Sequence, residues 1–108
     1  MTHRMKLVDF AFNAIKSGRK DIEVRLNDEK RRLLKIGDSI EFINMETGEL
    51  LKVKIINLYK FDSFSSLFNY FDYKRLGLSS GDSSIMYDFY SKEEEDKYGA
   101  LGIEIKKI

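Results

Sequence analysis

The sequence predicts one α+β domain, in which short strands alternate with short helices and form a small mixed β-barrel, closed or half closed. Three observations support this prediction. The chain has 108 residues, which is enough for one domain of about 100–200 residues. At least four short stretches show the alternation of apolar and polar residues that is typical of strands. No repeat, low-complexity stretch or proline-rich linker interrupts the chain, so the single domain is expected to cover residues 1–108.

A helix and a strand are expected first, after a short lead. Residues 9–17 are predicted to form the helix, ended by Gly18, because four apolar side chains lie at helical spacing: Phe10, Ala11, Ala14 and Ile15. Residues 21–26 alternate strictly, as in a half-buried strand. The face expected in the core carries Ile22, Val24 and Leu26. The face expected at the surface carries Asp21, Glu23 and Arg25.

Turn residues divide the middle of the chain. Asn27 is expected to cap a short helix with acidic residues in its first turn and basic residues later, which suits the helix dipole. Gly37-Asp38 predicts a turn into a strand at residues 39–43. Thr47-Gly48 predicts a hairpin loop, followed by the clearest strand of the chain at residues 51–58.

The last third is predicted to contain two helices and the final strand. Ser63 can cap a helix whose core positions recur at helical spacing: Phe64, Leu67, Phe68 and Phe71. Ser91 and Glu94 fit a capping box that opens a short helix ending at Gly99. Residues 102–108 alternate and complete the sheet.

The net charge of +1 conceals an uneven distribution of charge. Residues 1–60 carry 13 basic and 9 acidic side chains, whereas residues 61–108 carry 6 and 9. The basic excess is densest between Lys16 and Lys35. Such asymmetry indicates an anionic partner such as a nucleic acid. The alternative is an ordinary solvated surface whose two halves neutralise one another.

Composition excludes several classes of protein and of site. The chain has no cysteine, which excludes disulfide scaffolds and thiolate zinc sites and fits a reducing compartment. It has neither an apolar run of about 18 residues nor the apolar core of a signal peptide, so a cytoplasmic protein without a membrane partner is expected. Its one histidine, His3, is expected near a frayed terminus. No metal site, cofactor or histidine-dependent catalysis is therefore predicted.

The residues left for chemistry gather around the predicted strand at 21–26. Glu23 and Arg25 are two residues apart on one face, about 6.5–7 Å along the strand, and can hold a polar ligand between them. Arg25 offers a planar donor fork for a phosphate or a base edge, and Lys20 adds a second cation. The alternative is an exposed ion pair contributing about 0–1 kcal/mol.

Aromatic side chains are concentrated in the second half of the chain. Exposed rings, Phe89 among the candidates, can stack on unpaired bases, but the helical spacing described above favours a core role for Phe64, Phe68 and Phe71. Four tyrosines are left undecided: Tyr70, Tyr73, Tyr87 and Tyr90. An interaction module for a protein partner is a third possibility, and it requires these rings to be exposed in an apolar patch.

Three segments, in order, carry a resemblance to a known family. The first contains Phe10, Ile15-Lys16-Ser17-Gly18-Arg19-Lys20, Glu23 and Arg25-Leu26-Asn27-Asp28-Glu29-Lys30-Arg31-Arg32. The second contains Gly37-Asp38, Ile40 and Phe42. The third contains Tyr90-Ser91-Lys92-Glu93-Glu94, Tyr98-Gly99 and Gly102-Ile103-Glu104. From about Lys6 to Ile108, the chain resembles the ASCH domain family, in particular its small stand-alone bacterial and archaeal members.

This resemblance implies a PUA-like β-barrel that binds RNA in a cleft beside the barrel. By family analogy, Lys20, Glu23 and Arg25 line that cleft, and Arg19 and the basic segment around it would contact phosphates. The leading hypothesis is therefore an RNA- or nucleotide-binding domain.

A hydrolase is the alternative hypothesis. Some relatives in the superfamily are small amidohydrolases that act on acylated cytidine, with a set that resembles lysine, threonine three residues later and arginine two further on. Lys20 and Arg25 match this set, but Glu23 stands where the threonine would be. A carboxylate can still activate water as a general base, so Lys20 and Glu23 are the catalytic candidates, with Asp88 as a second carboxylate. A ribonuclease using the same groups is a further form of this alternative.

Overall fold

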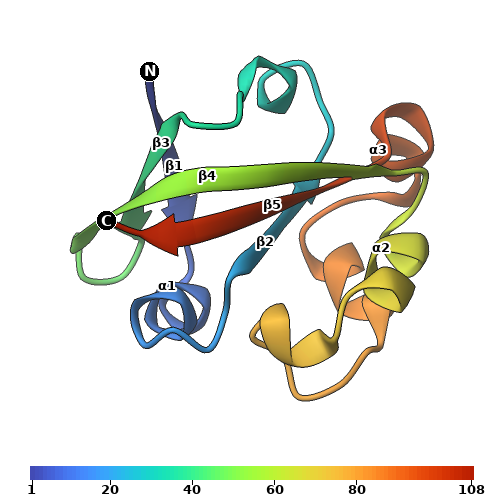
Figure 1. Cartoon of the computed structure of the whole chain (residues 1–108). Coiled ribbons are helices and arrows are strands. Elements are labelled where there is room, and N and C mark those ends of the chain that lie inside the picture. The colour runs from blue at the N-terminus through green and yellow to red at the C-terminus, as the bar shows by residue number, and fades with distance from the viewer.

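One curled sheet of five strands forms a half-barrel, with helices at its open side and at one end (Figure 1). The computed structural model describes residues 1–108. The strands are β1 Thr2–Leu7, β2 Ile22–Leu26, β3 Ser39–Asn44, β4 Leu50–Phe61 and β5 Ala100–Lys107. Their order is β1-β3-β4-β5-β2, with β1 parallel to β3 and every other pair antiparallel. The predicted α+β class and the barrel-like fold are confirmed.

Three α-helices and three 3₁₀ helices connect the strands. They are α1 Asp9–Lys16, η1 Arg31–Leu33, α2 Phe64–Tyr70, η2 Tyr73–Arg75, η3 Ser83–Asp88 and α3 Lys92–Tyr98. The predicted caps of the later helices are confirmed, because Ser63 accepts a hydrogen bond from the Ser66 amide and Ser91 and Glu94 form a capping box. Gly99 ends α3 at a φ of 73°. None of the helices is long and apolar enough to cross a membrane.

Two apolar clusters make up the core. The first fills the half-barrel between α1 and the sheet and consists of Met5, Leu7, Phe12, Ile15, Leu34, Ile40, Phe42, Val53, Ile55, Leu101, Ile103 and Ile105. The second lies where β2 and the start of β5 meet α2 and the segment after it, and consists of Ile22, Val24, Leu26, Phe64, Leu67, Phe68, Phe71, Leu76, Met86 and Ala100. The predicted core role of the α2 aromatics is confirmed. Each cluster gathers contributions from distant parts of the chain, so the boundary between them is set by tertiary packing.

The expected frayed N-terminus is instead a paired edge strand. His3 lies opposite Ile40 of β3, and its Nε2 is 2.8 Å from Asp38 Oδ2. Met5 and Leu7 are buried in the first core. The alternation Met5, Lys6, Leu7 was a strand signal, although parallel pairing with a distant segment cannot be recognised from a short lead.

The helix expected after β2 is also different. Asn27 does not cap it, because its amide still pairs with the Gly99 carbonyl at 3.0 Å. The chain therefore turns one residue later, where Asp28 Oδ1 accepts from the Arg31 amide at 3.0 Å. The result is a single 3₁₀ turn.

Two expectations about burial, one in α1 and one in β2, are wrong. Phe10 is exposed, and Phe12 takes the core position in α1. β2 is buried on both faces although it is an edge strand of the sheet, since Glu23 is only 3% exposed. Its polar face is covered by segments before and after it in the sequence.

Candidate functional site

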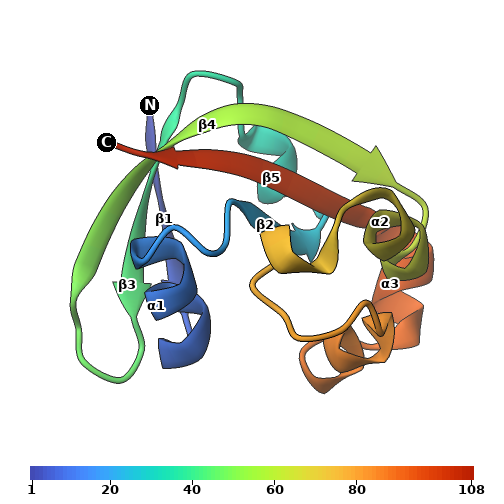
Figure 2. The ribbon, with the colours of Figure 1, turned by 60° about the horizontal axis from the view of Figure 1, so that its bottom comes forward.

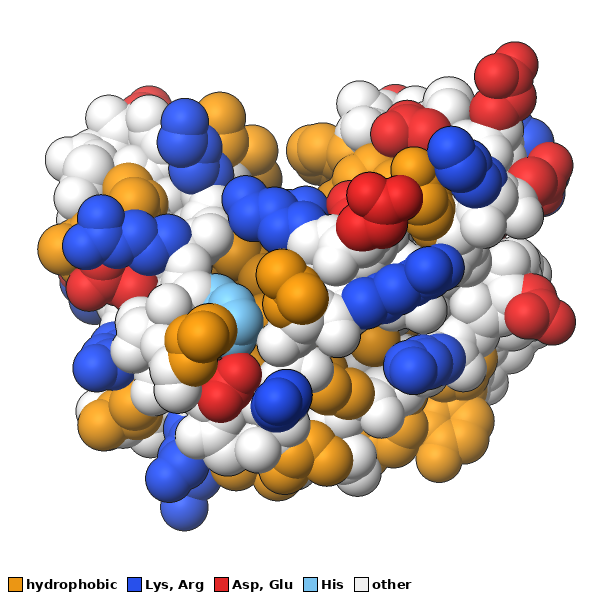
Figure 3. Space-filling view, turned by 90° about the horizontal axis from the view of Figure 1, so that it is seen from above, with side chains coloured by type: hydrophobic (Ala, Val, Ile, Leu, Met, Phe, Trp, Pro, Cys, Tyr) orange, Lys and Arg blue, Asp and Glu red, His pale blue; other side chains and the backbone are white.

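A cleft of about 410 Å³ lies at the boundary between the two apolar cores. The end of β1 and the start of α1 form one wall, the segment from Leu76 to Tyr90 forms the other, and β2 forms the floor. Figure 2 shows α1 and the segment containing η2 and η3 on either side of β2. In the space-filling view, the molecule is hollowed between two lobes whose facing flanks carry hydrophobic side chains (Figure 3).

The floor of the cleft carries a buried triad of charged side chains. Lys20 Nζ lies 2.8 Å from Glu23 Oε1, and Arg25 Nε lies 2.7 Å from Glu23 Oε2. The three side chains are only 10%, 4% and 13% exposed. Arg25 Nη2 also donates to the Lys6 carbonyl at 2.8 Å, which ties β2 to the end of β1. The three residues predicted to act together therefore lie together, and they are not an exposed ion pair.

The charges of Glu23 and Arg25 persist across the neutral pH range. Burial would raise the pKa of Glu23, but Lys20 and Arg25 outweigh it and lower the pKa to about 2. Burial likewise would lower the pKa of Arg25, whereas the Glu23 carboxylate raises it above its ordinary value. Two cations thus face one carboxylate, and the floor has one uncompensated positive charge.

The walls are apolar and carry exposed rings. Of the 18 residues that line the cleft, 13 are hydrophobic. Phe10 on one wall and Phe89 on the other are 60% and 58% exposed, and Met45 at the rim is 62% exposed. Tyr90 stands beside the triad, and burial raises the pKa of its hydroxyl. An opening of this kind is typical of a site for a flat, partly apolar ligand with a polar edge.

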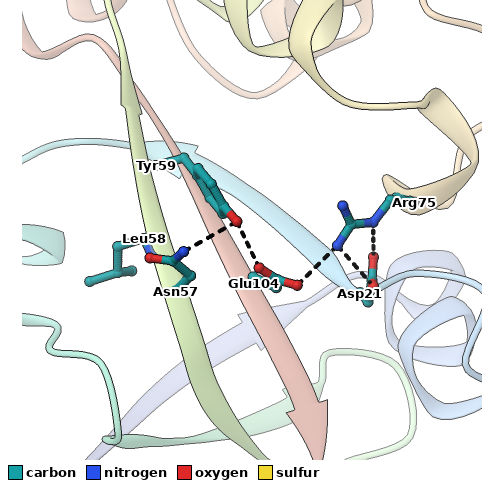
Figure 4. A network of polar contacts seen from close by, with 6 residues as sticks. All are labelled: Asp21, Asn57, Leu58, Tyr59, Arg75 and Glu104. Atoms are coloured by element: carbon teal, nitrogen blue, oxygen red, sulfur yellow. Dashed lines mark hydrogen bonds and ion pairs between the residues drawn. The ribbon is translucent and has the colours of Figure 1, made fainter.

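A polar network holds one end of the 76–90 wall against the sheet (Figure 4). Arg75 donates to both carboxylate oxygens of Asp21, at 3.0 and 3.1 Å, and to Glu104 Oε2 at 3.1 Å. Tyr59 donates to the other oxygen of Glu104 at 2.9 Å. η2 is thereby fixed to the residue before β2 and to β5, and through Glu104 to β4, immediately before the wall begins at Leu76.

A buried carboxylate holds the other end of the same wall. Glu95 in α3 is 1% exposed and accepts hydrogen bonds from the Phe64 amide at 2.7 Å and from the Tyr87 hydroxyl at 2.6 Å. Lys92 Nζ adds a contact at 3.1 Å. Burial would raise the pKa of Glu95, but these three partners lower it.

Two residues predicted for the site lie outside the cleft. Arg19 is exposed and donates to Ser17 Oγ at 3.1 Å. Asp88 is also exposed and lines a separate surface hollow with Asp82, so Glu23 is the one carboxylate in the cleft. No cluster of three or more His, Cys, Asp or Glu side chains could hold a metal ion.

The apolar walls of the cleft are not predictable from the sequence. The helical spacing of Phe10 favours a core position, Phe89 is one of many aromatics in the second half, and nothing in the sequence marks Met45. Of the undecided tyrosines, Tyr70, Tyr73 and Tyr87 are exposed outside the cleft and Tyr90 lies within it. No local pattern separates these positions, because exposure at the cleft depends on how α1 and the 76–90 segment pack.

The family model of the ASCH domain matches residues 5–108. The chain belongs to the ASCH domain family. Among solved structures, it is similar over its whole length to a hypothetical protein named PH0355, with 38% identity, a TM-score of 0.89 and full coverage of both chains. It is also similar to protein PF0455 from Pyrococcus furiosus, with 35% identity, a TM-score of 0.79 and coverage of 100% of this chain and 98% of that one.

A more distant ASCH protein has the same fold. The ASCH protein from Zymomonas mobilis is 13% identical, with a TM-score of 0.65 over 98% of this chain and 67% of that chain. No curated protein sequence matches the chain. Membership of the family confirms the resemblance drawn from the sequence, and a PUA-like fold is consistent with nucleic-acid interaction in general.

Proposed function

We propose that this ASCH domain binds single-stranded RNA and takes one unpaired base into the cleft. The observation that supports this most directly is the charged triad at the floor of an otherwise apolar cleft. Sequence-specific RNA recognition relies on unpaired bases that stack on aromatic side chains and form hydrogen bonds through their edges. The cleft offers both kinds of contact.

The floor suits the edge of a base better than a phosphate. Lys20 and Arg25 supply donors and Glu23 supplies an acceptor, so that a ligand with both donors and acceptors can be matched. A phosphodiester of the RNA backbone offers acceptors only and would lie beside the Glu23 carboxylate, whereas the edge of a base can also donate to it.

The walls suit the faces of a base. Phe10 and Phe89 are exposed on opposite walls and present apolar surface to the opening. Stacking of a base on an aromatic side chain contributes about 1–3 kcal/mol. These two rings explain how a neutral, flat group would be retained with few charged contacts.

The same geometry makes hydrolysis the weaker hypothesis. Both oxygens of Glu23 are engaged by cations, and its pKa of about 2 makes it a poor general base at neutral pH. Asp88, the proposed second carboxylate, is directed to another hollow.

Fluorescence titration with a short single-stranded RNA tests the proposal. Phe10→Ala and Phe89→Ala remove exposed rings and should leave folding intact, while each should weaken binding about 5- to 150-fold, as expected for loss of a stacked base. Tyr70→Ala removes an exposed ring outside the cleft and serves as the control. Equal binding by all three variants and the wild type would refute the proposal. Release of product by the wild type, abolished in Glu23→Gln, would instead establish the hydrolase.

A further inference from the structure

Two lysines face each other across the outer side of the sheet. Lys54 in β4 is the register partner of Lys106 in β5. Both are exposed, and no ion pair neutralises either of them. Like charges directly opposite each other on neighbouring strands destabilise a sheet. An anion lying between these side chains would relieve that repulsion.

Further cations lie at the end of β5 and beside it, at the edge of the sheet. The last register pair of β2 and β5 is Ile22 with Glu104, so the end of β5 extends beyond β2. At this open edge, Lys107 Nζ donates to the Lys16 carbonyl at 2.8 Å, at the C-terminal end of α1. The exposed Arg19 follows in the turn after that helix.

Three carboxylates carried by these segments or paired with them are already engaged. Glu49 is paired with Lys16 at 2.6 Å. Asp21 and Glu104 are paired with Arg75. Four cations form no ion pair and are called the basic track below: Lys54 and Lys106 on the outer side of β4 and β5, Lys107 at the end of β5, and Arg19 after α1.

The basic track begins where the cleft ends. Lys20 lies on the cleft floor with a side chain that is 10% exposed, whereas the neighbouring Arg19 points into solvent. One residue therefore separates a group that would contact a bound base from a group that would contact the adjoining backbone.

We infer that the basic track binds the phosphates of the RNA strand that leaves the cleft, so that the strand passes over the C-terminal end of α1 and onto the outer side of β4 and β5. This inference rests on the proposed function, because the cleft fixes one nucleotide and so fixes where the strand begins. In this arrangement Arg19 binds a phosphate outside the cleft. The binding would be insensitive to sequence, since phosphates carry no base information.

The salt dependence of binding tests this inference. The double variant Lys54→Gln/Lys106→Gln removes two cations that have no structural contact of their own. The control Lys60→Gln/Lys97→Gln makes the same change of charge at the other end of the β4–β5 pair and in α3. Affinity is measured at several salt concentrations for a dinucleotide and for a single strand of about twelve nucleotides, the length of a typical single-strand site.

For the longer strand, the track variant should have a log–log salt slope less steep by about 1.4, because each phosphate contact contributes about 0.7. The dinucleotide should bind the track variant as well as the wild type. An equal change in the control, or no change in the track variant, would overturn the inference while leaving cleft binding intact. Equal affinity of the wild type for the dinucleotide and for the longer strand would also overturn it. If neither RNA binds the wild type, the proposed function itself fails.

Poly-glutamate separates an RNA site from a site for an acidic protein. If poly-glutamate binds the wild type as tightly as the RNA and its binding is lost in the track variant, the track is a site for an acidic protein.

Discussion

The protein has two buried glutamates, Glu23 and Glu95, whose carboxylates have different kinds of partners. Each is at most 3% exposed and each has a lowered pKa. Glu95 accepts from the Phe64 amide of α2, the Tyr87 hydroxyl of η3 and Lys92 of its own helix α3, and does not line the cleft. Glu23 is held by two cations, all three lining an apolar opening.

This difference separates a structural carboxylate from a candidate site carboxylate. Burial and a shifted pKa are common to both, so neither property identifies function. The partners do distinguish them. Glu95 joins α2, η3 and α3 and completes the hydrogen bonding of the α2 terminus, whereas Glu23 organises two cations that would otherwise repel each other beside the cleft.

The largest effect is expected from Glu23→Ala. It leaves Lys20 and Arg25 buried without their counter-ion, which should lower the free energy of unfolding by about 3–5 kcal/mol. Urea denaturation measures the change. The triple variant Lys20→Met/Glu23→Leu/Arg25→Met replaces the triad with apolar side chains of similar volume and should recover most of the stability, while RNA binding stays lost. If the triple variant is as unstable as Glu23→Ala, the triad has a structural role and the comparison with Glu95 fails.

The unfolding free energy of the wild-type protein should fall at acid pH because of the same triad. The pKa of Glu23 is lowered from 4.5 to about 2 in the folded state. Its contribution to stability is therefore complete above about pH 4.5 and is lost as the pH falls through 4.5 towards 2, by about 3 kcal/mol. Unfolding free energies between pH 7 and pH 2.5 measure this loss. In the triple variant the fall should be smaller, and an identical fall would assign the acid sensitivity to other carboxylates such as Glu95.

Glu95→Ala should have the next largest effect on stability. It leaves the Phe64 amide and the Tyr87 hydroxyl without their acceptor, each costing about 1–3 kcal/mol when buried, and less for the partly exposed tyrosine. We expect a decrease of about 2–3 kcal/mol in the unfolding free energy. RNA affinity per folded molecule, measured below the unfolding temperature, should change far less than in Phe89→Ala. A complete loss of binding with folding retained would make Glu95 part of the site.

The sequence predicted the parts of this comparison that depend on local pattern. Alternation located β3, β4 and β5, the Ser91–Glu94 box located α3, and the spacing of Lys20, Glu23 and Arg25 identified the triad. Those features are set within a few residues of the chain.

The parts that were missed depend on distant packing. β1 needed its parallel partner β3, and the exposure of Phe10 needed the opposite wall of the cleft. Asp88 was placed in the site on chemical type alone, and the fold directs it elsewhere. The role of Glu95 could not be predicted from the acidic run at 93–96, because the groups that donate to its carboxylate come from α2 and η3.

Arg75 tests whether the wall matters for binding, because its contacts with Asp21 and Glu104 hold one end of the wall and Glu95 holds the other. Its side chain is 40% exposed, so Arg75→Ala should lower the unfolding free energy by only about 1 kcal/mol. It does not line the cleft, but it fixes η2 immediately before Leu76. We therefore expect RNA affinity to fall severalfold, with the association and dissociation rates both increased in a loosened cleft. Lys74→Ala, which removes a neighbouring exposed cation without a side-chain contact, is the matched control. Stopped-flow binding that shows the same small change in both variants would mean that the wall is rigid without Arg75 and that only the cleft residues decide affinity.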